Sequence, residues 1–169
     1  VVATETGWYV HERAEARVAP LPFHESADPS DPRFRSAHVT NGAGGTSTER
    51  YLADDPKIVR HLGPDVGPRL QSFLCRVLGA LKKHAPAHAP SHTHTLFAVG
   101  AADVMIDSKN RFRLLELNVN PSAPPQRACS PRFDAHLQTF LKDTLHLALV
   151  GNHASFLPVF PPHAFPRSQ

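Results

Sequence analysis

Two stretches of the chain carry apolar residues at the three- and four-residue spacing of an amphipathic helix. The first spans residues 67–83, and its predicted buried stripe consists of Leu70, Phe73, Leu74, Val77, Leu78 and Leu81. Cys75 falls off the centre of that stripe. The second spans residues 130–150, and its predicted buried stripe consists of Phe133, Leu137, Phe140, Leu141, Leu145 and Leu149. A helix with one apolar stripe needs a surface to cover, and a β-sheet is the expected partner.

Short segments of alternating polarity predict the strands of that sheet. Residues 96–107 and 111–119 are separated by only a few polar residues, so they are expected to pair as an antiparallel hairpin. Residues 1–20 predict another hairpin, with one turn at Thr6-Gly7 and a second turn near Arg13-Ala14 that returns the chain. Residues 38–40 predict one more short strand.

The segments between these elements are rich in residues that favour loops. Gly42, Gly44 and Gly45 could form a phosphate-binding turn, but the segment lacks the Lys-Ser/Thr pair of a P-loop, and a flexible surface loop is the alternative. A segment rich in Ala and Pro carries four histidines, His84, His88, His92 and His94. Its prolines disfavour a helix that would align these histidines on a metal, so a solvated connector is the preferred interpretation.

The end of the chain, residues 151–169, has the proline-rich composition of an extended tail. We therefore expect one folded domain over residues 1–150 and a tail over residues 151–169. Phe156, Phe160 and Phe165 are the candidate anchors of that tail onto another surface.

Composition narrows the classes of protein to consider. The 169 residues have a net charge of +3 and only 8% aromatic residues, and the basic residues are scattered, so a nucleic-acid surface is not indicated. Cys75 and Cys129 are too few for a disulfide scaffold, which favours a reducing, intracellular setting. No run approaches the roughly 20 apolar residues of a membrane span. Val1-Val2-Ala3 has the character of a strand interior, so we expect an N-terminal part to be missing.

The predicted hairpin contains the residues with the clearest chemistry. Simple alternation places Phe112, Leu114, Glu116 and Asn118 on one face of the second strand. An even number of loop residues would set Asp103 directly opposite Glu116 on that face, whereas a three-residue loop would put the two carboxylates on different faces. The even loop also keeps Phe97 and Val99 beside Phe112 and Leu114, so it is the preferred register.

Facing carboxylates repel one another unless a positive charge lies between them. Asp103, Glu116 and Asn118 all offer hard oxygen ligands, which suit Mg²⁺ together with nucleotide phosphates. The alternative is that Glu116 and Asn118 simply face solvent on an edge strand. The residues alone leave both interpretations open.

Three ordered motifs resemble the tubulin tyrosine ligase-like family. The segment FAVGAADVMIDSKNRFRLLELNVNPS is similar to its closing motif, through Gly100, Asp103, Asp107, Leu115, Glu116, Asn118 and Pro121. The segment YVHERAEARVAPLPF is similar to an upstream segment of the family, through Tyr9, Arg17, Pro22 and Phe23. The segment AHVTN is similar to its His-Leu-Thr-Asn motif, through His38, Thr40 and Asn41. The resemblance covers residues 1–150 in order.

This resemblance implies an α+β fold: a partial ATP-grasp domain, mainly antiparallel sheet, flanked by the two amphipathic helices. It implies an enzyme that uses ATP and Mg²⁺ to attach Tyr, Glu or Gly to a protein tail such as that of tubulin, through an acyl phosphate. Asp103, Glu116 and Asn118 would then hold Mg²⁺ and ATP, Arg17 would meet a substrate carboxylate or the developing phosphate charge, and Asn41 would shape the site. The implied setting is the cytoplasm, with the cytoskeleton, a cilium or a flagellum as more specific locations.

The resemblance stops short of the whole family domain. The upstream half, which supplies the ATP-binding lysines in the family, is not matched by this sequence. We therefore expect the chain to act with a missing N-terminal half or within a larger assembly. The alternative function is a noncatalytic structural subunit derived from an ATP-grasp enzyme.

Overall fold

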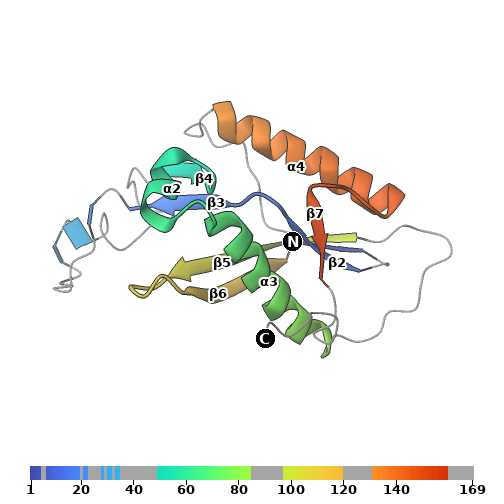
Figure 1. Ribbon diagram of the computed structural model, residues 1–169, viewed down its shortest axis with the longest axis horizontal. Coiled ribbons are helices and arrows are strands. Elements are labelled where there is room, and N and C mark those ends of the chain that lie inside the picture. The colour runs from blue at the N-terminus through green and yellow to red at the C-terminus, as the bar shows by residue number, and fades with distance from the viewer. Residues whose placement is uncertain are drawn as a thin grey trace.

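A computed structural model describes residues 1–4, 7–19, 21–22, 28, 30–31, 33–34, 49–84, 97–119 and 131–159. Its elements are β1 (Val2–Thr4), β2 (Trp8–His11), β3 (Glu15–Val18), β4 (Glu49–Leu52), α2 (Pro56–Leu62), α3 (Val66–Lys82), β5 (Phe97–Ile106), β6 (Phe112–Val119), α4 (Pro131–Val150) and β7 (Phe156–Pro158) (Figure 1). The larger sheet has the strand order β6-β5-β1-β2-β7, and β3 pairs with β4 in a second sheet. All strand pairs between the described elements are antiparallel, which confirms the mixed α+β class.

The N-terminal hairpin forms as predicted, but the chain does not return after its second turn. β1 pairs with β2, with Val2 opposite Tyr9. β3 instead leaves the main sheet and pairs with β4, with Arg17 opposite Arg50. The free edge of β2 is occupied by β7, so the predicted return at Arg13-Ala14 was wrong because a distant strand takes that place.

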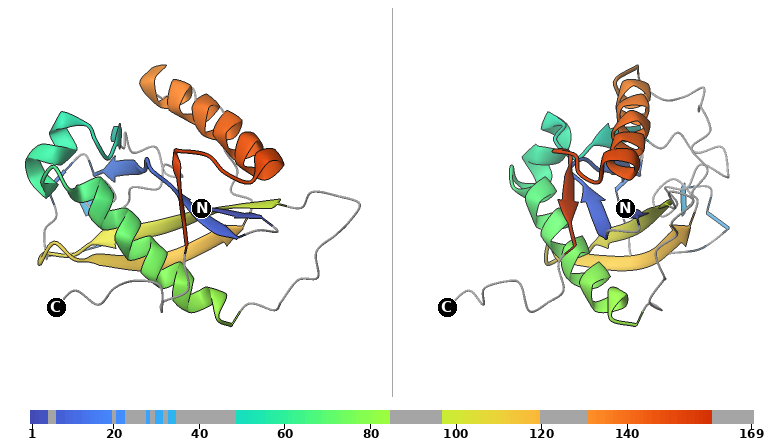
Figure 2. Two further views of the ribbon diagram at one scale, coloured as in Figure 1. Left: turned by 45° about the vertical axis from the view of Figure 1, so that its right-hand side comes forward. Right: turned by 90° about the vertical axis from the view of Figure 1, so that its right-hand side faces the viewer.

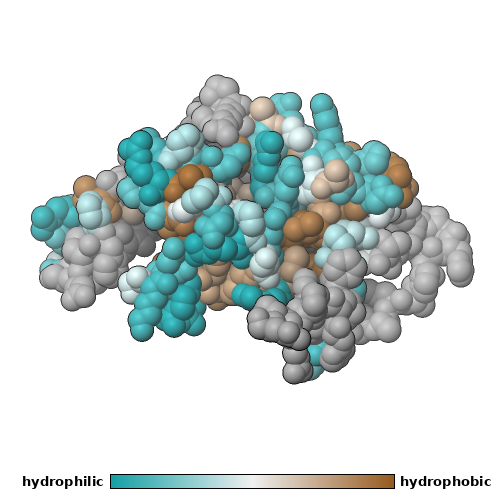
Figure 3. All heavy atoms as spheres, viewed as in Figure 1, coloured by the Kyte–Doolittle hydropathy of each residue, from teal (hydrophilic) through white to brown (hydrophobic). Residues whose placement is uncertain are grey.

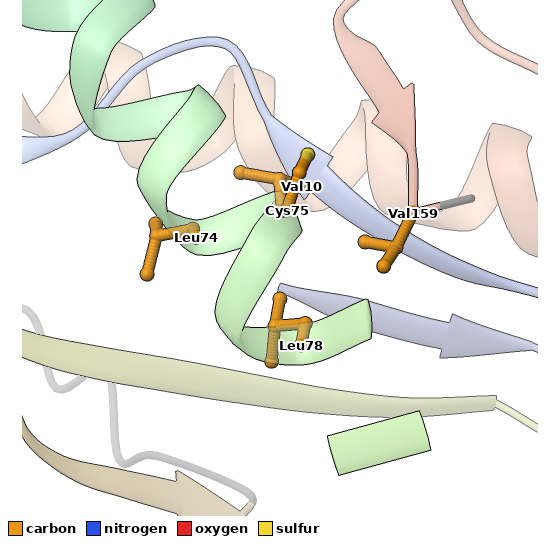
Figure 4. Close-up of a cluster of buried hydrophobic side chains, with 5 residues drawn as sticks. All are labelled: Val10, Leu74, Cys75, Leu78 and Val159. Carbon is orange, nitrogen blue, oxygen red and sulfur yellow. The ribbon is translucent and has the colours of Figure 1, made fainter. Parts of the chain in front are cut away.

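Helix α3 covers one face of the main sheet. Its buried residues Leu74, Cys75 and Leu78 pack against Val10 of β2 and Val159, which follows β7 (Figure 4). Cys75 is therefore a core residue, in contrast to its predicted place off the stripe, and its side chain is 5% exposed. The buried face includes Cys75 because α3 packs against both β2 and the segment after β7, which widens the covered stripe.

Helix α4 covers the opposite face of the sheet (Figure 2). Leu147 of α4 packs with Val2 of β1 and Phe156 of β7. The predicted stripe of α4 was wrong in part, because Leu141, Leu145 and Leu149 are 48%, 52% and 75% exposed. The helix is turned so that its buried side also includes Asp143. That side chain lies near His11 of β2 and His153, which precedes β7, and Phe140 contacts the His11 ring.

The folded unit continues past the predicted domain boundary at residue 150. β7 pairs with β2, with Phe156 opposite His11 and Leu157 opposite Val10. Phe156 is 5% exposed and Val159 is 3% exposed. Residues 151–159 thus belong to the fold, and Phe156 anchors onto the chain itself. Phe160 and Phe165 lie outside the described residues.

Two elements, β4 and α2, had no predicted counterpart. Helix α2 begins after Asp55, whose side chain accepts a hydrogen bond from the Lys57 amide, and Pro56 occupies its first turn. These are ordinary helix-start signals on a helix too short to show a clear period. The predicted strand 38–40, the glycine loop, and His88, His92 and His94 lie outside the described residues.

Candidate functional site

The β5–β6 hairpin places Asp103 directly opposite Glu116. The prediction that these two carboxylates face one another is correct, but the even-length loop that was expected to bring this about does not form. The Asp107 amide donates to the Arg111 carbonyl at 3.0 Å, which closes a three-residue loop that ends at Asn110 with φ at 56°. A β-bulge at Leu115 then shifts the register by one residue and restores the facing of the two carboxylates.

The bulge also changes which residues share a face. Val104 lies opposite Leu114 and packs toward α3, and Phe112 contacts Phe73 of that helix with ring centroids 5.7 Å apart. Asp103 and Glu116 point to the other face because β5 alternates and the bulge offsets β6. The predicted row of Phe112 and Leu114 with Glu116 was therefore wrong. The apolar and polar parts of β6 lie on opposite faces.

The face that carries the two carboxylates is open. It is the face that α4 covers over β1, β2 and β7, but on the β5–β6 hairpin Met105 is 57% exposed and the Glu116 side chain is exposed. Asn118 Nδ2 donates to Glu116 Oε1 at 3.0 Å, which leaves the amide oxygen available. In the part of the chain that the structure describes, neither Asp103 nor Glu116 forms an ion pair with a cationic side chain.

This donor set suits Mg²⁺ in one of its usual modes. Two carboxylates and an amide oxygen supply part of a six-oxygen shell, and waters or phosphates supply the rest. Among the described residues no group of three or more His, Cys, Asp or Glu side chains could hold a metal ion.

The one other predicted site residue that the structure describes, Arg17, is not brought to this face. Arg17 lies on the β3–β4 sheet, where its Nε donates to Glu15 Oε1 at 3.2 Å. Its side chain is 37% exposed. Asn41 lies outside the described residues.

A histidine–aspartate cluster that the sequence did not reveal joins β2, α4 and the connection from α4 to β7. Asp143 Oδ2 lies 3.7 Å from His11 Nε2, and Asp143 Oδ1 lies 3.4 Å from His153 Nε2. His11 is 7% exposed and its ring meets Phe140 and Phe156 at centroid distances of 5.1 and 4.9 Å. One sequence signal could have pointed to this cluster: alternation along β2 places His11 on the same face as Tyr9, which is the face that α4 covers. The cluster ties α4 to the sheet.

Burial controls the charge of this cluster. Desolvation lowers the pKa of His11, although a hydrogen bond to Arg13 and the nearby Asp143 act in the opposite direction. Desolvation likewise lowers the pKa of His136 on α4. The folded chain therefore favours neutral rings at both positions.

A shallow cleft of about 440 Å³ lies away from the hairpin face, between the turn after β2 and the connection of α2 to α3. It is lined by Glu12, Arg13, Asp54 and neighbouring residues, and neither Asp103 nor Glu116 contributes to it. Its ionisable lining consists of two acidic side chains and one basic one, and the hairpin face remains the stronger candidate site. No helix among the described residues is both long and apolar enough to cross a membrane.

Comparisons with models of protein families, with curated proteins and with solved structures give no match to this chain.

Proposed function

We propose that this chain is the C-terminal half of an ATP-grasp ligase of the tubulin tyrosine ligase-like type. The observation that carries the proposal is the facing of Asp103 and Glu116 across the hairpin, without a cationic partner in the described structure. Such a pair is unfavourable unless a cation completes it. The ordered motifs that resemble the family support Mg²⁺, bound together with ATP, as that cation.

The proposed chemistry assigns each residue a limited task. Asp103 and Glu116 would hold Mg²⁺, and Asn118, which fixes the orientation of Glu116 through its amide hydrogen bond, would offer its own oxygen. When bound, the metal supplies charge neutralisation for the ATP phosphates. Bound ATP would supply the phosphoryl group: its transfer to a substrate carboxylate would release ADP and give an acyl phosphate, from which an incoming amine would displace phosphate to form the amide. The family resemblance would also give Arg17, which lies on the β3–β4 sheet, the substrate carboxylate as its partner, and Asn41 the task of shaping the site.

The proposal includes a second body that covers the open face. Met105 is 57% exposed and Phe97 is 44% exposed on the carboxylate face, which supports contact with an upstream half of the ATP-grasp fold or with a larger assembly. The acceptor is an acidic protein tail such as that of tubulin, in keeping with the net charge of +3. The corresponding location is the cytoplasm, at the cytoskeleton or in a cilium or flagellum.

Metal binding at the hairpin is tested with Mn²⁺ as a paramagnetic stand-in for Mg²⁺. In ¹H–¹⁵N spectra of the chain, Mn²⁺ should broaden the amide signals around Asp103 and Glu116 first. Asp103→Asn and Glu116→Gln should each weaken this effect by about tenfold, because one of two charged ligands is lost. Glu12→Gln removes a carboxylate from an exposed position elsewhere and should leave it unchanged. Equal broadening in all three variants would show that the hairpin holds no metal.

Catalysis is tested separately with the chain supplied with the upstream half that the proposal includes. Transfer of labelled Tyr, Glu or Gly to tubulin should require ATP and Mg²⁺, and Glu116→Gln should lower it by about 100-fold or more. The Glu12→Gln control should retain transfer. Full activity in Glu116→Gln would exclude the assigned site, whatever the metal titration shows.

The second candidate function is a noncatalytic subunit of an assembly, and one observation favours it. Leu141, Leu145 and Leu149 form an exposed apolar stripe on α4, on the side turned away from the sheet. In that case Leu145→Asp should release the chain from its assembly in size-exclusion chromatography, while Glu116→Gln should have no effect on assembly or on any activity. A loss of amino-acid transfer in Glu116→Gln would exclude this alternative.

A further inference from the structure

The turn of the β5–β6 hairpin gathers basic side chains around one carboxylate. Asp107 Oδ1 accepts hydrogen bonds from the amides of Lys109 and Arg111 at 2.9 and 3.0 Å. Asp107 Oδ2 accepts from Arg111 Nε at 2.9 Å and from Arg113 Nε at 3.2 Å. Desolvation acts to raise the pKa of Asp107, but these hydrogen bonds outweigh it and hold the pKa at about 2. The carboxylate therefore stays ionised and fixes two guanidinium groups.

The cations of this turn are only partly neutralised. Arg111 uses Nε for Asp107, and Arg113 uses Nε and one terminal nitrogen. In the described structure the Lys109 ammonium, both terminal nitrogens of Arg111 and the remaining one of Arg113 have no acceptor. Arg111 and Arg113 are 54% and 56% exposed. Preorganised donors therefore point to solvent. We call Lys109, Arg111 and Arg113 the arginine turn.

Helix α3 adds a further cation to the same end of the hairpin. Arg69 donates to the Asn110 carbonyl at 2.8 Å and lies over the Phe112 ring at 5.4 Å from its centroid. Its other terminal nitrogen lies 3.6 Å from Asp65. At the turn itself four cations thus meet two carboxylates, Asp65 and Asp107, while Asp103 and Glu116 lie farther along the hairpin, past the Met105–Arg113 pair. Hydrophilic side chains gather over this end of β5 and β6 in Figure 3.

We propose that the arginine turn binds a carboxylate-rich, extended segment of a protein. A guanidinium with two free nitrogens matches a carboxylate with two parallel hydrogen bonds, so fixed arginines recognise acidic side chains with defined geometry. β6 is the outer strand of the sheet among the described elements, so a chain can lie beside it.

The apolar surface along the hairpin supports a protein ligand over a nucleic acid. Along β6, the outer strand, Leu115, Leu117 and Val119 are 60%, 37% and 75% exposed, so a chain that lies beside β6 meets apolar side chains as well as the arginine turn. Aromatic rings for base stacking are poorly supplied, since Phe97 is the one aromatic among the exposed large hydrophobic residues described, and it lies at the opposite end of the hairpin. Aliphatic contacts beside a cationic group suit a segment that mixes acidic and apolar residues.

The idea that the arginine turn docks the acidic acceptor of the ligase rests on the proposed function. The idea that it binds an acidic peptide does not, because such binding needs neither ATP nor Mg²⁺. A binding assay without nucleotide or metal therefore separates the two ideas. Loss of the metal site would leave peptide binding intact, and loss of peptide binding would leave the metal site intact.

The test uses fluorescence anisotropy of a short labelled peptide of alternating Glu and Val with the whole chain at low salt. Arg111→Gln combined with Arg113→Gln should weaken binding by about tenfold or more, and added salt should weaken binding to the unsubstituted chain. Lys109→Gln removes one free cation that makes no side-chain contact in the described structure, and should weaken binding by a smaller factor. Arg60→Gln combined with Arg76→Gln removes the same charge from exposed positions on α2 and α3 and serves as the control.

Three results would overturn the proposal. The first is an affinity that is the same in the arginine-turn variant and in the control pair. The second applies if the variant with both arginines replaced does not fold: Lys109→Gln then decides, and binding as tight as that of the unsubstituted chain would count against the proposal. The third is a single-stranded DNA probe of equal charge that binds more tightly than the peptide and loses binding in the same variants, because that would identify a nucleic-acid surface instead.

Discussion

Phe156 offers the sharpest test of how the two ends of the chain are joined. Its ring is 5% exposed and lies 4.9 Å from the His11 ring and 6.2 Å from the Phe140 ring, measured between centroids. Truncation of a buried phenylalanine to alanine costs about 3–5 kcal/mol, and the enclosure of this ring by a strand and a helix favours about 4 kcal/mol. Total stability for a domain is about 5–15 kcal/mol, so the loss is a large share of it.

The assay is urea unfolding followed by circular dichroism and by the fluorescence of Trp8. With a urea dependence of about 2 kcal/mol per molar, Phe156→Ala should lower the midpoint by about 2 M. Leu157→Ala is the matched control, since Leu157 lies next along β7 but is 44% exposed, and it should cost about 1 kcal/mol or less. If Phe156→Ala does not fold, Phe156→Leu should lose roughly 1 kcal/mol. Equal midpoints for Phe156→Ala and Leu157→Ala would refute the placement of β7 in the core.

Three further outcomes are expected. Burial lowers the pKa of His11 and His136, so at these positions the folded state binds fewer protons than the unfolded chain; their contribution to stability should be complete above the ordinary pKa of 6.5 and should be lost as the pH drops below it, and a urea midpoint that rises on acidification would contradict this. Burial raises the pKa of the Cys75 thiol, so peptide mapping after treatment with a thiol reagent should show Cys75 modified only once urea unfolds the chain; rapid labelling in buffer would contradict its core position. Deletion of Leu115 should remove the bulge and still leave the two carboxylates facing, since the ladder below the bulge then continues unbroken; cross-strand nuclear Overhauser contacts report this, and their loss would show that the bulge itself sets the register.

The candidate site shows how a sequence can predict a contact for an incomplete reason. Alternation and a short connection predicted that Asp103 faces Glu116, and the register agrees. The loop has an odd length, and the bulge at Leu115 compensates for it. A bulge leaves little mark in the sequence, because its extra residue needs only to tolerate a local kink. The pairing was predictable, whereas the separation of Phe112 from Glu116 onto opposite faces was not.

Helix α4 shows the limit of periodicity. Its leucines predicted that a helix forms, and it does, but several of them are exposed while Thr144 is 2% exposed and Leu147 fully buried. The buried side is set by contacts with His11, which is far from α4 along the chain, and with Phe156, which follows the end of α4. A stripe of apolar residues identifies a face, and the partner decides whether that face is the one covered.

The sequence by itself determined the local elements: two amphipathic helices, the N-terminal hairpin and the β5–β6 hairpin with its facing carboxylates. Each depends on spacing within a few residues, where backbone geometry fixes which side chains share a face. Only the tertiary structure decided that β3 leaves the main sheet, that β7 joins it, and that Asp143 meets His11 from a distant strand together with His153 from the connection after α4. In each case more than one segment could cover the same sheet edge or helix face. The packing of the whole chain decides which segment does so.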